Sequence, residues 1–269
     1  GSAGTAVITL DDAGLWTDSR YFIQADEQLE GTGIRLFKDR LPETPSIGEW
    51  LGSVLKESDK VGIDGWVNSH QEAASLRNDL KAKGLSLETM TEDIFDNIWT
   101  DRPSLPQSPV FILDETRTGA SCSEKIARIQ EAIAKNGSSV IILSALDEIA
   151  WTLNLRGEDV HCNPVFISYL LIAKGGYTLY ILEEKITPEV RTYLESHQVA
   201  IKPYSALAED LRTFDSNREG VLQISPLANE ALYDLSTRYA ETIVAPSPVA
   251  LMKAVKNETE QAGFRKAME

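Results

Sequence analysis

The chain has 269 residues, of which 42% are hydrophobic and 25% charged, a composition typical of a globular protein with one large or two ordinary domains. Its formal net charge of −15 would repel a polyanion and no cluster of lysine and arginine offsets it, so we expect no nucleic-acid partner. No apolar run approaches a membrane span, and no basic segment followed by an apolar core opens the sequence, so we expect neither a transmembrane helix nor a signal peptide.

The two cysteines, Cys122 and Cys162, are far apart in the sequence and have no CxxC spacing. Two isolated cysteines do not make a disulfide framework, and nothing in their spacing favours a zinc or redox role. We therefore expect ordinary thiols in a reducing, cytoplasmic compartment.

The first hundred residues alternate strand-like and helix-like segments. Residues 5–17 have apolar runs at both ends and turn residues between them, which predicts a β-hairpin. Asp18 and Ser19 can cap a helix that ends near Leu29. The remaining pattern predicts strands at 34–37 and 61–64 and helices at 47–55 and 69–83, the last with a capping box at Ser69 and Glu72 and a stop at Gly84.

A proline-rich stretch separates the two halves of the chain. Pro103, Pro106 and Pro109 each remove a backbone donor and favour an extended residue before them. This stretch is typical of a domain linker.

The second half repeats the alternation of strands and helices. Ser121 and Glu124 form a capping box for a helix that Gly137 terminates. Strands are predicted at 139–143, 165–173, 177–182, 199–202, 221–224 and 242–244, and further helices at 146–153, from 187, at 207–211 and at 228–235. Because both hairpins and crossovers occur, we predict an α/β protein of two domains with mixed sheets flanked by helices.

Both ends of the sequence indicate a longer chain. Asn257 and Glu260 are helix start signals, and no terminator follows them before Glu269. At the other end, GSAG leads at once into a predicted strand. We therefore expect truncation on both sides.

No catalytic or metal-binding pattern stands out. His70, His161 and His197 have no HExxH, HxH or helical pair spacing, and we expect each to be solvated or locally bonded. The carboxylate pairs at 147–148 and 158–159 flank a helix with no nearby ligand pattern. GxSxG, P-loop and GxGxxG motifs are also missing from the sequence.

Arg20 is the one residue with a chemical reason to bind a ligand. It lies between the apolar run 15–17 and the helix that follows, and strand ends in α/β sheets often face ligands. Its guanidinium could donate two hydrogen bonds to a peptide carbonyl or carboxylate. The alternative is an arginine that is solvated or paired with Asp18.

Seven stretches carry a resemblance across nearly the whole chain. They are GSAGTAVIT at 1–9, WTDSRYF at 16–22, IWTDRP at 98–103, SALDEIAW at 144–151, NLRG at 154–157, NPVFISY at 163–169 and KAVKNE at 253–258. In this order they resemble the aminopeptidase P family, the Xaa-Pro aminopeptidases, in its three-domain branch.

The resemblance implies two consecutive creatinase-like domains before a catalytic pita-bread domain that is absent here. The first would cover 1–103 and lack its N-terminal part, the second would cover 104–255, and 256–269 would begin the catalytic domain. A dinuclear manganese centre would lie in the absent domain, because the family's ligands fall beyond Glu269. The chain itself would hold no cofactor and would be inactive alone.

The resemblance also implies roles and partners. Arg20 matches the arginine of the family's DxRYF motif, which reaches the substrate pocket, whereas Trp151, Phe166 and Tyr169 are expected to be packing residues. The partners would be the chain's own catalytic domain and a peptide with proline at its second position, and the full-length protein would be a homodimer.

Two alternatives stay open. The chain could be a creatinase-like module used only for peptide or protein binding, as in the pseudo-enzyme domain of the FACT histone chaperone. It could also be a prolidase or creatinase relative, although those usually have one N-terminal domain. The NLRG and NPVF motifs favour the aminopeptidase.

Overall fold

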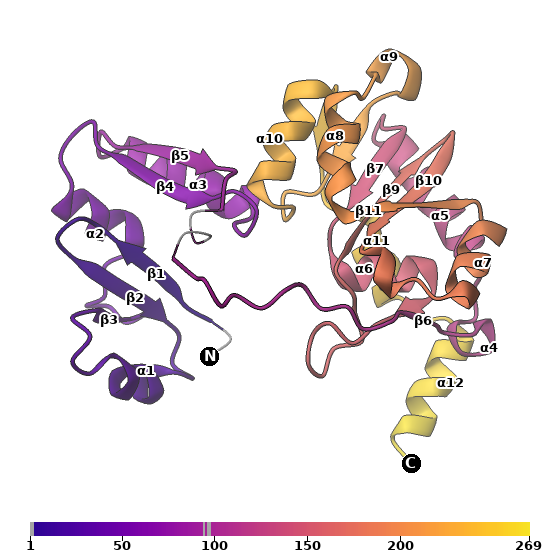
Figure 1. The fold of residues 1–269 in the computed structure, drawn as a ribbon, viewed down its shortest axis with the longest axis horizontal. Coiled ribbons are helices and arrows are strands. Elements are labelled where there is room, and N and C mark those ends of the chain that lie inside the picture. Colours follow the sequence, from indigo (N-terminus) through magenta and orange to yellow (C-terminus); the bar gives the residue numbers. More distant parts are fainter. Residues whose placement is uncertain (1–2, 94, 96–97) are drawn as a thin grey trace. The chain divides into compact units, whose positions relative to one another are not determined.

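A computed structural model describes residues 3–93, 95 and 98–269. The chain divides into two compact units: a first unit of residues up to Ile63 with Glu72–Glu88, and a second unit of Asp64–Gln71 with Thr89–Glu269. Each unit contains both strands and helices (Figure 1). The predicted α/β class with mixed sheets and two domain-like parts is confirmed.

The first unit is built on a three-stranded sheet in the order β1-β2-β3. Strands β1 (Thr5–Ile8) and β2 (Ala13–Thr17) form the predicted antiparallel hairpin, and β3 (Arg35–Lys38) runs parallel to β2. The other elements are α1 (Phe22–Leu29), α2 (Ile47–Val54), β4 (Lys60–Asp64), α3 (His70–Lys81) and β5 (Ser86–Met90), of which β4 and β5 pair with each other. The last three elements straddle the division between the units.

Aromatic side chains form part of the core of the first unit, beside Leu51, Leu80 and Leu85. Trp16 stacks on Phe37 with ring centroids 4.0 Å apart, and Trp50 meets Trp16 edge-on at 5.3 Å. Trp16 Nε1 donates to the Pro45 carbonyl at 2.8 Å, so its polar atom is satisfied. Gly14 lies under this stack, where a Cβ would come within 2.6 Å of the Phe37 ring. The close aromatic packing therefore requires glycine at this position.

A six-stranded mixed sheet in the order β11-β10-β9-β7-β12-β13 forms the centre of the second unit. Its strands are β7 (Val140–Leu143), β9 (Ser168–Ala173), β10 (Gly176–Ile181), β11 (Val199–Pro203), β12 (Leu222–Ile224) and β13 (Thr242–Val244). The pairs β7–β9 and β9–β10 are antiparallel, and the other three pairs are parallel. A two-residue pairing of β6 (Phe111–Ile112) with β8 (Leu155–Arg156) lies outside this sheet.

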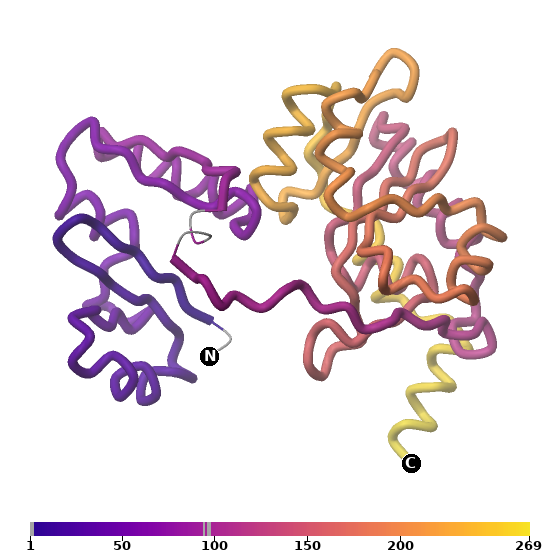
Figure 2. Tube along the Cα trace, viewed as in Figure 1, coloured from indigo at the N-terminus to yellow at the C-terminus, as the bar shows by residue number. Residues whose placement is uncertain are grey.

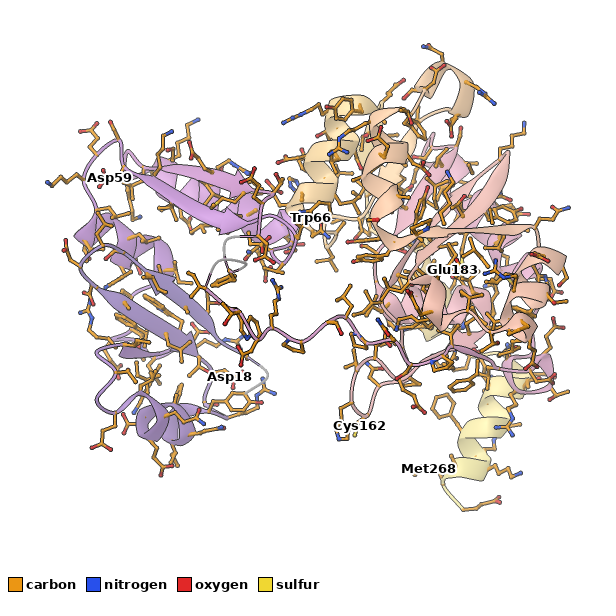
Figure 3. The ribbon with its side chains drawn as sticks, viewed as in Figure 1. Asp18, Asp59, Trp66, Cys162, Glu183 and Met268 are labelled. Carbon is orange, nitrogen blue, oxygen red and sulfur yellow. The ribbon has the colours of Figure 1, made fainter. Side chains whose placement is uncertain are left out.

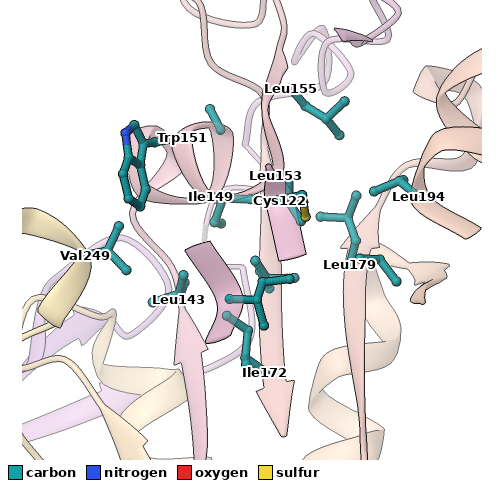
Figure 4. Close-up of a cluster of buried hydrophobic side chains, with 14 of the residues drawn as sticks. Cys122, Leu143, Ile149, Trp151, Leu153, Leu155, Ile172, Leu179, Leu194 and Val249 are labelled. Atoms are coloured by element: carbon teal, nitrogen blue, oxygen red, sulfur yellow. The ribbon is translucent and has the colours of Figure 1, made fainter. Parts of the chain in front are cut away.

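Both faces of this sheet are covered. Successive residues of a strand point to opposite faces, so neighbouring residues of β7 report on the two faces separately. Ile141 and Leu143 belong to one buried cluster, whereas Val140 and Ile142 belong to another. The first cluster includes buried residues of α5 (Cys122–Lys135), α6 (Leu146–Leu153), α7 (Pro188–Ser196) and α11 (Pro248–Ala254), and part of it is seen in Figure 4. The second includes buried residues of α8 (Leu207–Arg212) and α10 (Glu230–Tyr239).

Five further elements among the described residues complete the second unit. They are α4 (Glu115–Thr118), α9 (Ser216–Glu219), α12 (Glu258–Ala267) and the 3₁₀ turns Glu183–Lys185 and Tyr204–Ala206. Residues 103–109 form neither helix nor strand and run as an extended stretch (Figure 2). Among the described residues, no helix combines the length and apolarity that crossing a bilayer requires.

Local sequence signals located several helix ends correctly. The capping boxes of Ser121 with Glu124 and of Asn257 with Glu260 are both present. The cap predicted at Asp18 and Ser19 is wrong, because α1 begins after Tyr21 and has no side-chain cap. The Asp18 carboxylate is instead bonded to Arg20.

The predicted strand 165–173 is shorter in the structure. Strand β9 begins at Ser168, because the residues before it form a loop. The buried carboxylate of Asp159 holds this loop in place. Asp159 Oδ2 accepts the backbone N–H of Ile167 at 2.6 Å, and Asp159 also forms an ion pair with Lys185 in which neither side chain is exposed. This long-range pairing could not be predicted from the apolar run alone.

Candidate functional site

Arg20 lies in the connection between β2 and α1, as the sequence predicted. The turn begins at Asp18, whose carbonyl accepts the Tyr21 N–H at 3.0 Å (Asp18 is labelled in Figure 3). The Arg20 guanidinium donates from Nε to Asp18 Oδ1 at 2.9 Å and from Nη2 to Oδ2 at 2.6 Å. The backbone N–H of Arg20 also donates to Oδ1, at 3.0 Å. A short turn thus holds the arginine side chain in one orientation.

The pair of Arg20 and Asp18 is exposed to solvent, with 63% of the arginine side chain accessible. The hydrogen bond from Arg20 lowers the pKa of the Asp18 carboxyl, and the same bond raises the pKa of the guanidinium. Both groups are therefore charged at neutral pH. The pairing uses the Nε–Nη2 edge of the guanidinium, and a ligand could approach its other edges.

Asp18 also lines an open cavity of about 460 Å³ in the first unit. The ionisable residues around this cavity are Asp18, Asp39, Arg40, Glu72 and Asp79. Two of these carboxylates are paired with arginines, Asp18 with Arg20 and Asp39 with Arg40, and Arg20 itself is not among the residues that line the cavity.

The three histidines lie in different surroundings. His70 Nδ1 is 2.7 Å from Glu230 Oε2, a carboxylate without solvent exposure, and the His70 ring stacks on Tyr233. His197 Nδ1 is 2.8 Å from the hydroxyl of Ser123, and His161 lies exposed in a loop. The partners of His70 and His197 are both distant in sequence, so the expectation of a solvated or locally bonded histidine is wrong for these two.

Metal ligands do not gather in the part of the chain that the structure describes. No group of three or more histidine, cysteine, aspartate or glutamate side chains there is arranged to hold an ion. The described residues thus do not fit the dinuclear centre that the resemblance places in a further domain, and we derive no metal-dependent step from them. Both cysteines are free: burial raises the pKa of Cys122 to about 12, and Cys162 is exposed on a loop (Figure 3).

The sequence analysis missed a buried polar cluster under helix α12. Lys125 is 1% exposed and lies over the ring of Trp151, whose indole N–H donates to Glu260. A signal for it existed, since Lys125 falls three residues after Cys122 and four before Ile129, on the apolar stripe of α5. Trp151, Phe166 and Tyr169 are buried, as expected of packing residues.

Family models match both parts of the chain. Residues 1–94 and residues 101–260 each match a model described as the creatinase/prolidase N-terminal domain. The chain belongs to the creatinase/prolidase N-terminal domain family. Of the first motif, residues 1–2 lie outside the described residues, and the rest begins the hairpin of the first unit.

The relatives identify a narrower group. Xaa-Pro aminopeptidase 1 of Dictyostelium discoideum is 38% identical over 99% of this chain and 43% of its own length. A probable Xaa-Pro aminopeptidase P of Sordaria macrospora is 39% identical over 99% of this chain and 45% of its own length. The expected resemblance to Xaa-Pro aminopeptidases is thus confirmed, and the chain spans less than half the length of these relatives.

A solved structure supports the same grouping. The X-prolyl aminopeptidase of Caenorhabditis elegans, described as a cytosolic enzyme with a di-nuclear active site, superposes with a TM-score of 0.91 at 30% identity. The match covers 99% of this chain and 44% of that one. The fold of this creatinase-type chain is therefore that of a part of a larger enzyme.

Proposed function

We propose that this chain is the non-catalytic N-terminal portion of a metal-dependent Xaa-Pro aminopeptidase, a hydrolase that removes the residue preceding proline. One observation carries the proposal: Xaa-Pro aminopeptidases match 99% of the chain, while the chain covers only 43–45% of them. The remaining length of such a protein would contain the catalytic domain and its two metal ions, with manganese the expected metal.

The layout that we propose follows the resemblance. A first creatinase-like domain covers 1–103, a second covers 104–255, and 256–269 begins the catalytic domain. The family matches support this division, since one ends at 94 and the next begins at 101. The extended stretch 103–109 fits a linker, and α12 begins at Glu258 with a capping box.

Within this layout the chain shapes the substrate pocket and supports the catalytic domain. Arg20 is the residue that we assign to substrate binding. Asp18 orients its guanidinium before any ligand arrives, which reduces the entropy lost when the arginine donates to a peptide carbonyl.

The partners follow from the same proposal. They are the catalytic domain of the same polypeptide, a peptide with proline at its second position, and a second copy that binds through the catalytic domain. We place the protein in the cytoplasm, like the cytosolic relative from Caenorhabditis elegans.

A peptide-release assay tests the proposal. A longer protein that carries this chain releases the first residue of an Xaa-Pro peptide when manganese is present, and the 269-residue chain alone releases none. If the longer protein binds such peptides without releasing the residue, it is a binding module instead.

A further inference from the structure

The first turn of helix α12 packs against the end of α4. Asn257, the residue that caps it, donates from Nδ2 to the Thr118 carbonyl at 2.8 Å. Gly119, next in the chain, has a φ of +67°, and a Cβ there would lie 2.7 Å from Asn257 and from Thr259. The turn after α4 is therefore built from a residue without a side chain, which allows α12 to approach closely.

A second contact joins α12 to helix α6. Trp151, on α6, donates from Nε1 to Glu260 Oε1 at 3.2 Å, while Oε2 of the same carboxylate accepts the Asn257 N–H at 2.9 Å. Glu260 therefore takes part both in the capping box and in a bond to α6. Both oxygens of its carboxylate are used.

A buried lysine supports this indole. Lys125 Nζ lies 4.3 Å from the centre of the Trp151 ring and donates to the Trp151 carbonyl at 2.8 Å and to Asn154 Oδ1 at 2.6 Å. These two acceptors are uncharged. Charged and titratable groups on three elements also interact electrostatically with the ammonium: Cys122 and Arg128 on α5, Arg156 on β8 and Glu260 on α12.

Burying a charge whose hydrogen-bond partners are neutral costs free energy unless another group attracts the charge. Among the groups that interact electrostatically with Lys125, the Glu260 carboxylate does most to favour the charged ammonium, and it belongs to α12. The Trp151 ring lies under the ammonium, and its electron-rich face stabilises a cation there. The indole therefore links the ammonium to the carboxylate by contacting both.

We propose that Lys125, Trp151 and Glu260 form a positioning network that, with Gly119, seats the first turn of α12 against α4 and α6 and fixes the direction of this helix. Under the proposed function this seat would orient the catalytic domain. The seating itself does not depend on that function, and the test below involves no hydrolysis.

The test is hydrogen exchange at pH 7 of the α12 amides of residues 261–264 in the 269-residue chain. Trp151→Phe keeps the ring and removes the indole donor, and Glu260→Gln keeps an acceptor and removes the charge. Each should exchange about five- to tenfold faster, the effect of losing or weakening one hydrogen bond. Glu258→Gln, which removes an exposed charge from the same turn, is the control and should exchange like the wild type.

A second measurement separates a charge network from simple packing. The indole N–H resonance of Trp151 should titrate with a midpoint near the Lys125 pKa, which burial lowers to about 8. Glu260→Gln should move this midpoint to lower pH, because Glu260 favours the charged ammonium, and Lys125→Met should abolish the titration. Gly119→Ala tests the seat independently and should raise α12 exchange while leaving the α5 amides protected.

Two results would overturn the proposal. One is α12 exchange in Trp151→Phe and Glu260→Gln that stays within the range of Glu258→Gln. The other is a Trp151 midpoint that Glu260→Gln leaves unchanged, since the ammonium would then not sense α12.

Discussion

Two hydrogen bonds join Arg20 to Asp18 only two residues earlier, at 2.9 and 2.6 Å, so a fully charged pair stands in a short turn at the end of β2. Exposed ion pairs of this kind contribute little to stability, because water and salt screen them and ordering the side chains costs entropy. The pair is thus better suited to hold the guanidinium ready for a ligand than to stabilise the first unit.

Arg20→Ala in a longer protein with the catalytic domain should reduce kcat/KM for an Xaa-Pro peptide about 10- to 100-fold, the effect of losing a charged hydrogen bond to the substrate. Stability of the first unit should change little, because the pair is exposed. Arg191→Ala removes another exposed, ion-paired arginine and should leave kcat/KM unaltered. A kcat/KM for Arg20→Ala equal to that of Arg191→Ala would exclude Arg20 from substrate binding.

The pKa of Asp18 should depend on its pairing with Arg20. Arg20 holds the pKa of Asp18 below its ordinary value, so this pair's contribution to folding is present at neutral pH and is lost as the pH falls through that lowered pKa. In Arg20→Ala the pKa of Asp18 should rise toward 3.8, as followed by carboxyl NMR signals. An unchanged pKa would mean that the pair does not persist in solution.

The buried pair of Lys185 and Asp159 should behave differently from the exposed one. Lys185→Met leaves a carboxylate buried without its cation, which we expect to cost about 3–5 kcal/mol in the unfolding free energy of the second unit. Exchange of the β7 amides would measure this cost. The double variant Lys185→Met with Asp159→Asn should recover part of the loss, because no buried charge remains, and a purely additive loss would contradict this explanation.

Gly14→Ala should destabilise the aromatic core of the first unit. The added methyl would press on the stacked rings of Phe37 and Trp16, and overpacking of this kind costs about 1–3 kcal/mol. Exchange of the β2 amides measures the effect. Gly263→Ala, a position where an added Cβ meets no neighbour, is the control and should not destabilise the chain.

The free energy of unfolding at alkaline pH should depend on the titration of Lys125. Because burial lowers its pKa in the folded state from 10.5 to about 8, the unfolded chain binds more protons between these values. This group's contribution to stability therefore increases as the pH rises from about 8 to 10.5, by an amount on the order of 3 kcal/mol. Comparing wild type with Lys125→Met isolates it from the other titrating groups, and equal pH dependence in both would show that Lys125 titrates normally.

Much of the fold could be predicted because its signals are local. Capping boxes such as Ser121 with Glu124 mark helix starts, and the wholly apolar run of β7 predicts a buried strand. The pairings of Lys185 with Asp159 and of His70 with Glu230 could not be predicted in this way. Their partners are distant in sequence, and only the folded chain brings them together.

The functional residues also differ in whether a local sequence signal marks them. Arg20 could be named because its motif and its place after a strand are both visible in the sequence. Trp151 could be placed in the core, but its bond to Glu260 spans 109 residues. Lys125 was overlooked because a lysine on an apolar stripe is readily taken for a solvated residue whose stem alone packs.

The most direct test of the central claim compares two proteins in one assay of release of the first residue from an Xaa-Pro peptide. One is the 269-residue chain. The other is a longer protein in which this chain is followed, after α12, by a segment that corresponds to the remaining length of the relatives. Each is assayed after chelation and again with manganese restored. The account predicts metal-dependent release by the longer protein and none by the chain alone. Release by the chain alone, or no metal-dependent release by the longer protein, would contradict it.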